Sequence, residues 1–337
     1  MTDFKSKLAE FKAARQPTIK ELKFTITRIK KSPLSIMGLA ILVFYIALAV
    51  LAPVLAPPVP PPMGKPDPFM VWKDLNIPAI NRTLPHPPNS IHPFGTTEES
   101  YDLYYGCIWG TITAFRVGLM VIVLSLIIGL VTGVIAGYYG GIVDEVLMRF
   151  TDMVIAVPGL VLCMALVVAL PPQFVINLGF TQLTIALSKL DKVLLALVLV
   201  GWPSYTRVIR GEILKVREED YVEAARAAGC SDFRVMIKHI LPNSIYPILI
   251  MASLDTGAIV LTAAALSFLG LGAPSGYADW GQLISLSRNY IYANISSPAA
   301  NWWVWLIPGL FIFTFVLGWN LLGDAFRDIL DPTLRRR

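Results

Sequence analysis

The chain has 337 residues, of which 55% are hydrophobic and only 15% charged, and its mean hydropathy is positive. A soluble protein of this length could not bury so many apolar side chains, so the composition excludes an ordinary soluble domain and favours a protein surrounded by lipid. The net charge of +5 is not arranged as a basic stripe interleaved with aromatic residues, so nucleic-acid binding is not indicated. The three cysteines have no paired spacing and indicate neither a disulfide framework nor a metal site.

The N-terminal segment is basic and amphipathic. It carries nine lysines and arginines in residues 1–33, which is too many for the start of a cleaved signal peptide. Phe4, Leu8 and Phe11 share one helical face, which favours either a helix lying in the membrane interface or one packed against a neighbouring subunit. We therefore assign residues 1–33 to a cytoplasmic amphipathic segment and residues 34–55 to the first membrane span.

Residues 56–111 are expected to form an extracytoplasmic loop, because twelve prolines between positions 57 and 93 exclude regular helix there. Two Asn-x-Ser/Thr sequons, at Asn81 and Asn294, both fall on the expected outer side. They are glycosylation acceptors if the host modifies its surface proteins, and chance occurrences otherwise. His92 has no histidine partner for a metal site and is expected to form a structural turn.

The remaining permease core, residues 112–323, contains charge-poor intervals long enough to cross a bilayer about 30 Å thick, which takes roughly 20 helical residues. Gly129, Gly133 and Gly137 recur every fourth residue along the second span, a pattern that predicts close packing of helices. With the first span the intervals make six, the other five being 117–138, 153–170, 193–210, 245–270 and 302–322.

The distribution of basic residues gives an orientation. If the N-terminus is cytoplasmic, 21 of the 28 lysines and arginines lie on the inner side of the membrane. The positive-inside rule therefore predicts that both termini are cytoplasmic, including the tail at residues 324–337. Asp144 and Asp152 then lie near cytoplasmic ends and are expected to pair locally or with Arg149.

Asp255 is the only carboxylate expected deep inside a span. A charge at a helix centre costs about 2.5 to 3.5 kcal/mol on insertion scales, so this side chain should avoid lipid. A structural hydrogen bond to a neighbouring helix is one explanation, and a place lining a translocation pathway is the other.

Residues 212–243, between the fourth and fifth spans, form a charged segment that predicts a helical elbow. The acidic residues 218–220 suit the positive N-terminal end of a first helix. Gly229 suits a left-handed residue after that helix. Ser231 is placed to cap a second helix, which Pro242 is expected to end.

On the first helix of this elbow, Glu223, Ala224 and Ala225 would form a flat surface with a single carboxylate. From the charge pattern alone, the segment could be a solvated connection or a docking surface for another protein. The ordered string from Glu223 through Gly229 to His239-Ile240-Leu241-Pro242 resembles the cytoplasmic loop of binding-protein-dependent ABC importer permeases, which in that family docks into a cleft of an ATPase subunit. Its ending is similar to the oligopeptide, dipeptide and nickel branch.

The resemblance extends over about residues 30–334 and points to the C-type permease subunit. Two departures from the pattern are that Ser100 and Tyr101 replace a usual Gly-Arg pair, and that Ala263 stands where many relatives have a glutamate. The matching segments are His92 to Asp102, Ala136 to Asp152, Leu266 to Gly272 with Trp280-Gly281, and Asn320 to Asp328 with Asp331-Pro332.

This resemblance implies an all-α integral membrane protein with six transmembrane helices, both termini cytoplasmic, and a cytoplasmic coupling elbow between spans four and five. The chain would form half of the translocation pathway of an ATP-driven importer for peptides or oligosaccharides, with nickel complexes a further possibility in this branch. Its partners would be a second homologous permease subunit, two ABC ATPase subunits, an extracytoplasmic substrate-binding protein and the lipid bilayer.

The residues themselves carry no visible hydrolytic chemistry. The chain lacks a Gly-x-x-x-x-Gly-Lys-Ser/Thr phosphate-binding loop, so we expect ATP and Mg²⁺ to bind to the partner ATPases and no cofactor to bind here. No catalytic residue and no metal site are expected. A secondary transporter or channel without ATPase partners is the alternative, and it would predict an internal repeat, broken helices at mid-membrane or several buried charges.

Overall fold

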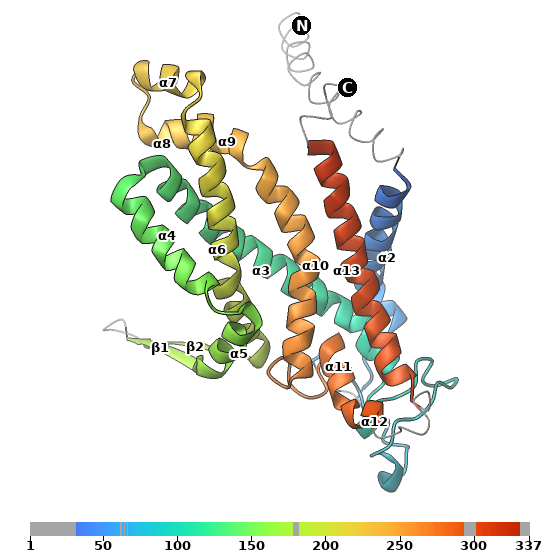
Figure 1. Cartoon of the computed structure of the whole chain (residues 1–337). Helices are drawn as coiled ribbons and strands as arrows, with labels where there is room; N and C mark the ends of the chain where they lie inside the picture. The colour runs from blue at the N-terminus through green and yellow to red at the C-terminus, as the bar shows by residue number, and fades with distance from the viewer. Residues whose placement is uncertain are drawn as a thin grey trace, which may run out of the picture.

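The computed structural model describes residues 32–60, 63, 65, 67–177, 182–292 and 301–330. Figure 1 shows a bundle of long helices with short elements at its two ends. Five helices are long and apolar enough to cross a membrane, and these are α2 (Pro33–Leu55), α3 (Leu103–Tyr139), α6 (Lys189–Arg217), α10 (Tyr246–Phe268) and α13 (Trp303–Leu330). The predicted all-α membrane fold is therefore confirmed.

A sixth crossing requires that two helices be taken together as one broken span. α4 (Gly141–Ile155) and α5 (Gly159–Ala169) meet at an angle of 90°, so the continuous third span predicted for residues 153–170 is wrong. Pro158 explains the break, because proline lacks an amide hydrogen and disfavours helical geometry in the preceding residue. Pro158 itself has an extended backbone, with ψ of 124°.

α3 begins earlier than the predicted second span at residues 117–138. The carboxylate of Asp102 accepts a hydrogen bond from the backbone N–H of Tyr105 at 2.6 Å and so caps the helix. Residues 103–111, which were assigned to the outer loop, are therefore the first turns of a 37-residue helix. These turns are covered by protein, since Leu103 and Cys107 are fully buried.

The predicted close packing along the glycine ridge is confirmed. Gly129, Gly133 and Gly137 of α3 lie against α6, and a Cβ atom at Gly133 would come within 2.8 Å of the carbonyl oxygen of Thr206. The hydroxyls of Thr132 and Thr206 are 2.7 Å apart across the same contact. Small residues thus let the two helix backbones approach closely. Such close packing matters in lipid, because there no hydrophobic effect drives the helices together.

A cap closes the end of the bundle opposite the elbow. It consists of the proline-rich chain with the short helices η1 (Ala79–Asn81) and η2 (Glu98–Ser100), joined by α11 (Trp280–Leu286) and α12 (Arg288–Tyr292). Backbone hydrogen bonds connect its two halves, from Val71 N–H to Gly276 O at 2.8 Å and from Ala278 N–H to Phe69 O at 2.7 Å. The cap is thus an ordered unit even though its first half is rich in proline.

His92 has a larger role in this cap than the structural turn predicted for it. It is 2% exposed, and its Nδ1 and Nε2 lie 2.5 Å and 3.1 Å from carboxylate oxygens of Asp102 and Asp74. Burial lowers the pKa of His92, but the two carboxylates raise it by more, so the net pKa lies above the usual value. The imidazole therefore joins the capping residue of α3 to the proline-rich chain.

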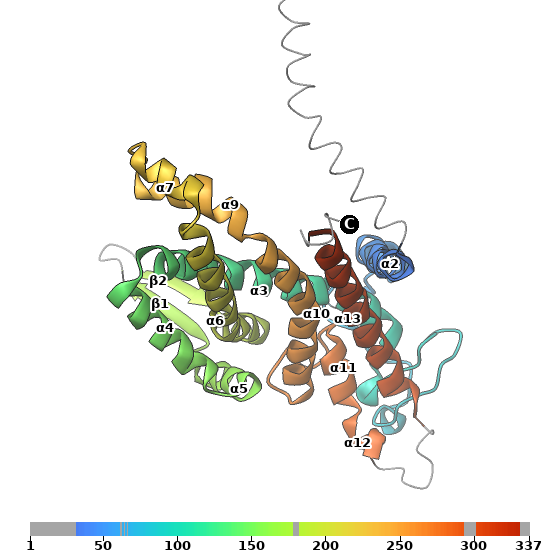
Figure 2. The same ribbon diagram turned by 45° about the horizontal axis from the view of Figure 1, so that its top comes forward.

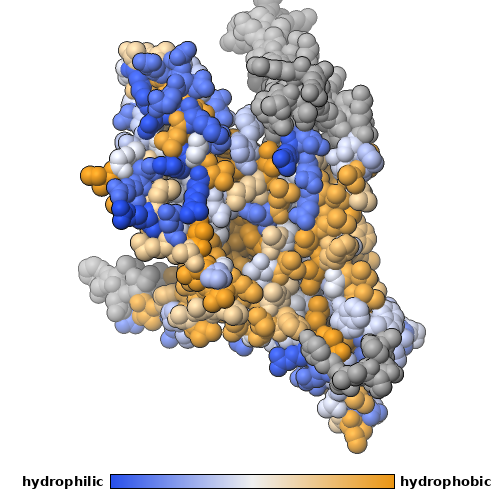
Figure 3. Space-filling model, viewed as in Figure 1, coloured by the Kyte–Doolittle hydropathy of each residue, from blue (hydrophilic) through white to orange (hydrophobic). Residues whose placement is uncertain are grey.

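One element was not expected at all, a two-stranded antiparallel hairpin of β1 (Gln173–Asn177) and β2 (Gln182–Ala186) between α5 and α6. Elsewhere the surface follows the membrane pattern. Figure 3 shows hydrophobic side chains over the middle of the bundle and hydrophilic ones over the elbow end. Figure 1 places the elbow, the start of α2 and the end of α13 at the same end, as the predicted topology requires. The side of the membrane on which that end lies stays a prediction.

Candidate functional site

The charged segment between α6 and α10 folds as the helical elbow that the sequence predicted. It consists of α7 (Asp220–Ala227), α8 (Asp232–Val235), a π-helical turn η3 (Met236–Ile240) and α9 (Leu241–Ser244), and it projects beyond the ends of the spans (Figure 1). Asp220 and Glu223 lie in the first turn of α7, where carboxylates complement the helix dipole.

Gly229 has the predicted left-handed backbone, with φ of +79°. Its N–H donates to Arg226 O at 2.9 Å, and the N–H of Cys230 donates to Ala225 O at 3.1 Å. These two bonds make a Schellman motif, which satisfies the last carbonyl groups of α7 and turns the chain sharply. A Cβ atom at this position would meet no other atom within 4 Å, so the requirement for glycine is conformational and not steric.

Two details of the elbow differ from the prediction. Ser231 precedes α8 with an extended backbone, but its side chain makes no capping hydrogen bond. Pro242 does not end the second helix, because the chain passes through the π-helical turn into α9. In that wider turn the N–H of Leu241 donates to Met236 O, five residues back instead of the usual four. The helical hydrogen-bond pattern therefore changes just before Pro242, which has no N–H to donate.

The predicted flat surface is only partly exposed. Glu223 and Ala224 lie on the outside of α7, whereas Ala225 is only 8% exposed and packs inside the elbow. Including Ala225 in the surface was therefore wrong. The helical period explains the difference, because Ala225 follows Val222 by three residues and shares its inward face.

The elbow is fastened to the membrane helices by contacts with the end of α3. The hydroxyl of Tyr138 donates to Asp232 Oδ1 at 2.6 Å, and the guanidinium of Arg226 lies 5.3 Å from the centre of the same ring. Arg217 of α6 donates to the carbonyl oxygens of Gly137 and Tyr138 at 3.2 Å. These contacts link α7 and α8 to the end of α3, and α3 in turn to the end of α6.

Apolar packing supports the same connection. Fully buried Val222 and Val235 of the elbow lie in one core cluster with Ile209 and Ile213 of α6 and with Ile248 of α10. Because protein interiors are close-packed and compress little, such a cluster transmits displacement. The elbow therefore shares one buried core with α3, α6 and α10.

Ion pairs fix α4 against α6 near the elbow. Arg210 Nε lies 3.0 Å from Asp144 Oδ1, and Arg207 pairs with Asp152. The expected pairing of these acids with Arg149 was wrong, since Arg149 pairs with Glu145 one turn away on its own helix. The two pairs join residues more than fifty positions apart, which local sequence spacing could not show.

Asp255 accepts a hydrogen bond from the hydroxyl of Tyr205 at 2.8 Å, between α10 and α6. This contact agrees with the structural explanation of its carboxylate. A place along the pathway stays a prediction. An apolar cavity of about 340 Å³ lies nearer the cap end between α5, α6 and α10, with Gly159, Cys163 and Thr262 among its lining residues, and Asp255 does not line it.

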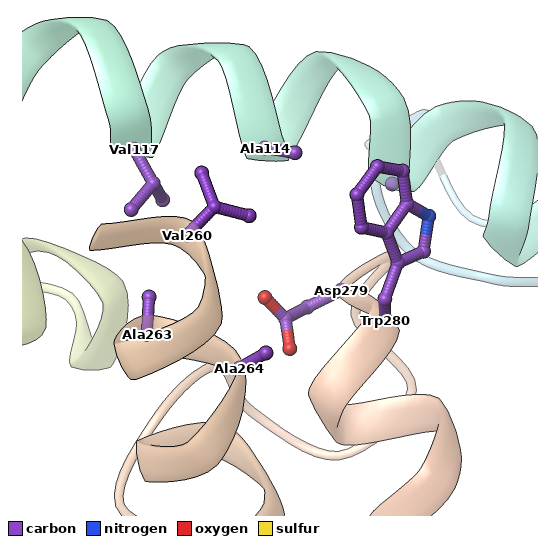
Figure 4. A pocket seen from close by; sticks show the side chains of 8 residues that line it. Ala114, Val117, Val260, Ala263, Ala264, Asp279 and Trp280 are labelled. Atoms are coloured by element: carbon purple, nitrogen blue, oxygen red, sulfur yellow. The ribbon is translucent and has the colours of Figure 1, made fainter. Parts of the chain in front are cut away.

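The sequence reading also missed the buried carboxylate of Asp279. Asp279 caps α11 by accepting from Gln282 N–H at 2.8 Å, and it is 7% exposed. Figure 4 shows its carboxyl group directed into a small cavity beside Val260 and Ala264 of α10. The cavity volume is about 10 Å³, near the minimum that admits one water molecule. Burial raises the pKa of Asp279, although the hydrogen bond from Gln282 lowers it.

The structure describes the remaining predicted sites only in part. Asn81 is exposed at the end of η1, where a glycan would meet no obstruction from buried packing, and Asn294 lies outside the described residues. The amphipathic pattern of residues 1–33 and the end of the tail lie outside them as well, apart from the first residues of α2. In the described part of the chain, no group of three His, Cys, Asp or Glu side chains could hold a metal ion.

Comparison with known proteins identifies the family. The model described as binding-protein-dependent transport system inner membrane component matches residues 129–336, and that of the N-terminal TM domain of oligopeptide transport permease C matches residues 23–68. A dipeptide transport system permease protein of Alkalihalophilus pseudofirmus is 34% identical over 308 residues, covering 91% of this chain and 88% of that protein.

Two further relatives have similar coverage. A probable D,D-dipeptide transport system permease protein of Escherichia coli is 33% identical, covering 90% of this chain and 89% of that protein. An oligopeptide transport system permease protein of Bacillus subtilis is 30% identical, covering 93% and 90% respectively. The chain therefore belongs to the family of binding-protein-dependent transport system inner membrane components, as a multi-pass permease subunit of the C type.

Proposed function

We propose that this permease forms half of the translocation pathway of an ATP-driven ABC importer that carries peptides delivered by an extracytoplasmic binding protein. The relatives named for dipeptide, D,D-dipeptide and oligopeptide transport support peptides over oligosaccharides or nickel complexes as the substrate class. Family membership also supports an ATP-driven importer over a secondary transporter or channel.

The elbow is the coupling surface in this proposal, and its rigid attachment to the spans is the observation that carries the idea. Glu223 and Ala224 face outward on α7, where an ATPase subunit would bind them closely. Tyr138 and the buried cluster around Val222 would pass the movement of that subunit to α3, α6 and α10. ATP and Mg²⁺ would bind to the ATPase, and this chain would supply no catalytic group.

The number of partners follows from the elbow. The described chain offers one elbow and hence one docking surface, whereas closure of two ATPase subunits on ATP requires two. A second, homologous permease subunit would supply the other elbow and the other half of the pathway. The binding protein would approach the opposite end, which the cap covers.

Two variants of the elbow test the proposal in proteoliposomes that contain the partner subunits and the binding protein. Glu223→Lys reverses the exposed charge without touching the packing, and Gly229→Val places a β-branched residue at a left-handed position, which costs on the order of 1 to 3 kcal/mol locally. Both should insert normally and lose ATP-driven peptide uptake, and Gly229→Val should also retain less ATPase on purification.

A matched control separates coupling from general damage. Gly229→Asn keeps a residue that tolerates the left-handed region and should retain much of the uptake. Wild-type uptake by both Glu223→Lys and Gly229→Val would show that the elbow is a solvated connection. Uptake driven by an ion gradient without ATP would favour the secondary transporter instead.

A further inference from the structure

The β1–β2 hairpin extends from the bundle at the end opposite the elbow. Figure 1 shows it running sideways from α5, across the direction of α6 and α10, and in the turned view of Figure 2 the strands are drawn between α4 and α6. The links to the helices are short, since only residues 170–172 separate α5 from β1 and only residues 187–188 separate β2 from α6. The hairpin is therefore held at the depth where these two helices end.

The base of the hairpin is ordered. Leu187 N–H donates to Pro172 O at 2.8 Å, and Lys192 Nζ donates to Leu170 O at 2.6 Å. The side chain of Ser188 caps α6 by accepting from Asp191 N–H at 3.1 Å. These contacts fix the direction in which the strands leave the bundle, so their sideways course is built into the fold.

The residue pairs of the two strands alternate in polarity. Two pairs are wholly apolar, namely Phe174↔Ile185 and Ile176↔Leu183. The three pairs between and beside them each include a polar residue, namely Gln173↔Ala186, Val175↔Thr184 and Asn177↔Gln182. Because successive residues of a strand face opposite sides, this alternation gives the hairpin one apolar face and one mixed face.

The apolar face is only partly covered by the described chain. Phe174 is 37% and Ile185 is 43% exposed, and neither belongs to a buried core cluster. Residues 171–187 also contain no aspartate, glutamate, lysine or arginine, which is a long uncharged interval for a segment beyond the end of a span. A two-stranded hairpin alone in water is marginally stable at best, so its order requires a further contact.

We propose that the hairpin lies in the bilayer interface, with the face of Phe174 and Ile185 turned toward the acyl chains and the face of Val175 and Thr184 turned toward water. The absence of charge removes the main cost of this location, and the sideways course matches the plane of the interface. The described strands pair only with each other, so their outer edges carry free backbone groups. Those groups need water or headgroups as partners, which excludes the hydrocarbon core.

A protein partner fits the same face less well. Five residue pairs span about 17 Å along the strands and about 10 Å across them, or on the order of 170 Å². A stable protein interface buries about 800 Å² on each partner. The uncharged segment also offers no ionic group that would select a partner, whereas insertion at a membrane surface depends only on apolar area and position.

Site-directed spin labelling of the assembled transporter in lipid nanodiscs tests this location. Single cysteines replace Phe174 or Ile185 on the apolar face and Val175 or Thr184 on the other face. The background is Cys230→Ser, because the other two cysteines are buried. The measurement compares relaxation of each nitroxide by oxygen, which concentrates in lipid, with relaxation by a water-soluble nickel chelate.

We expect labels at positions 174 and 185 to favour oxygen, at the shallow depth of the interface, and labels at 175 and 184 to favour the nickel chelate. Equal access of the chelate to both faces would show a hairpin in water and overturn the proposal. Shielding of positions 174 and 185 from both reagents would show that protein covers the face, and would overturn it as well. Oxygen access at mid-bilayer depth for all four labels would contradict the interfacial location.

Discussion

The contact between α3 and α6 makes a quantitative prediction for Gly133→Ala. In a helix interior, alanine is normally favoured over glycine by roughly 0.5 to 1 kcal/mol. At this position, however, the added Cβ would lie 2.8 Å from the carbonyl oxygen of Thr206 and would also collide with the side chain of Ile209. The carbonyl oxygen belongs to the backbone of α6, and a β-branched side chain has little rotamer freedom in a helix, so neither can move aside locally.

The helices must separate to accept the methyl group. Overpacking of this kind typically costs about 1 to 3 kcal/mol, which exceeds the gain in helix propensity. We therefore expect Gly133→Ala to lower the free energy of unfolding by about 1 to 2 kcal/mol. In a protein of this size, such a loss corresponds to a melting temperature lower by about 2 to 4 °C.

Gly211→Ala is the matched control, because a Cβ at this position of α6 would meet nothing within 4 Å. It should keep the wild-type melting temperature or raise it slightly. Both variants are compared with wild type by scanning fluorimetry in one detergent, with uptake measured in parallel. A melting temperature of Gly133→Ala equal to or above that of Gly211→Ala would refute the argument that the glycine ridge sets the distance between the helices.

Three further predictions concern polar contacts between elements. Tyr138→Phe removes the hydroxyl that donates to Asp232, and a hydrogen bond to a charged acceptor is worth about 1.5 to 3 kcal/mol. Amide hydrogen exchange should therefore become faster in the elbow but not in the spans. Unchanged exchange in the elbow would argue against its rigid attachment. Tyr205→Phe leaves Asp255 without its donor and should lower the melting temperature, whereas unchanged stability with reduced uptake would favour a place for the carboxylate along the pathway. The pKa of His92 is raised in the folded protein, so the stability it contributes is complete below the unfolded pKa of about 6.5 and is lost as the pH rises through the folded pKa. The melting temperature should thus decrease on the alkaline side in wild type but less in His92→Gln, and a wild-type increase over that range would contradict the ion-pair assignment.

The elbow could be predicted from the sequence because its determinants are local. Acidic residues at the start of α7, glycine after its end and the following turn lie within about one dozen positions, and each acts on its immediate neighbours. The exposed residues of the candidate surface, Glu223 and Ala224, were predicted from the same stretch of sequence. Assigning Ala225 to it failed because the side of α7 that faces inward is set by packing against α6, α8 and η3, and not by α7 itself.

For other errors, the sequence does contain a signal of the correct structure, but the hydropathy of the segment favoured a different prediction. Pro158 marks the break between α4 and α5, although the interval around it is as apolar as a continuous span. Polar and apolar residues alternate only over residues 182–185, because residues 174–176 are all apolar, and both strands follow a span and contain no charge. Asp279 directly precedes α11 in the manner of a helix cap, and only the fold shows that its carboxyl is buried against α10.

The sequence by itself determined the membrane environment, the approximate spans and the glycine ridge of α3, because composition and periodicity act through solvent and through near neighbours. Tertiary structure alone decided which partner each charged or polar group found. Arg210 meets Asp144, His92 lies between Asp74 and Asp102, and Tyr205 reaches Asp255. Side chains so far apart in the chain come together only when the helices pack, and the cost of leaving them unpaired in a medium of low dielectric then selects these pairs.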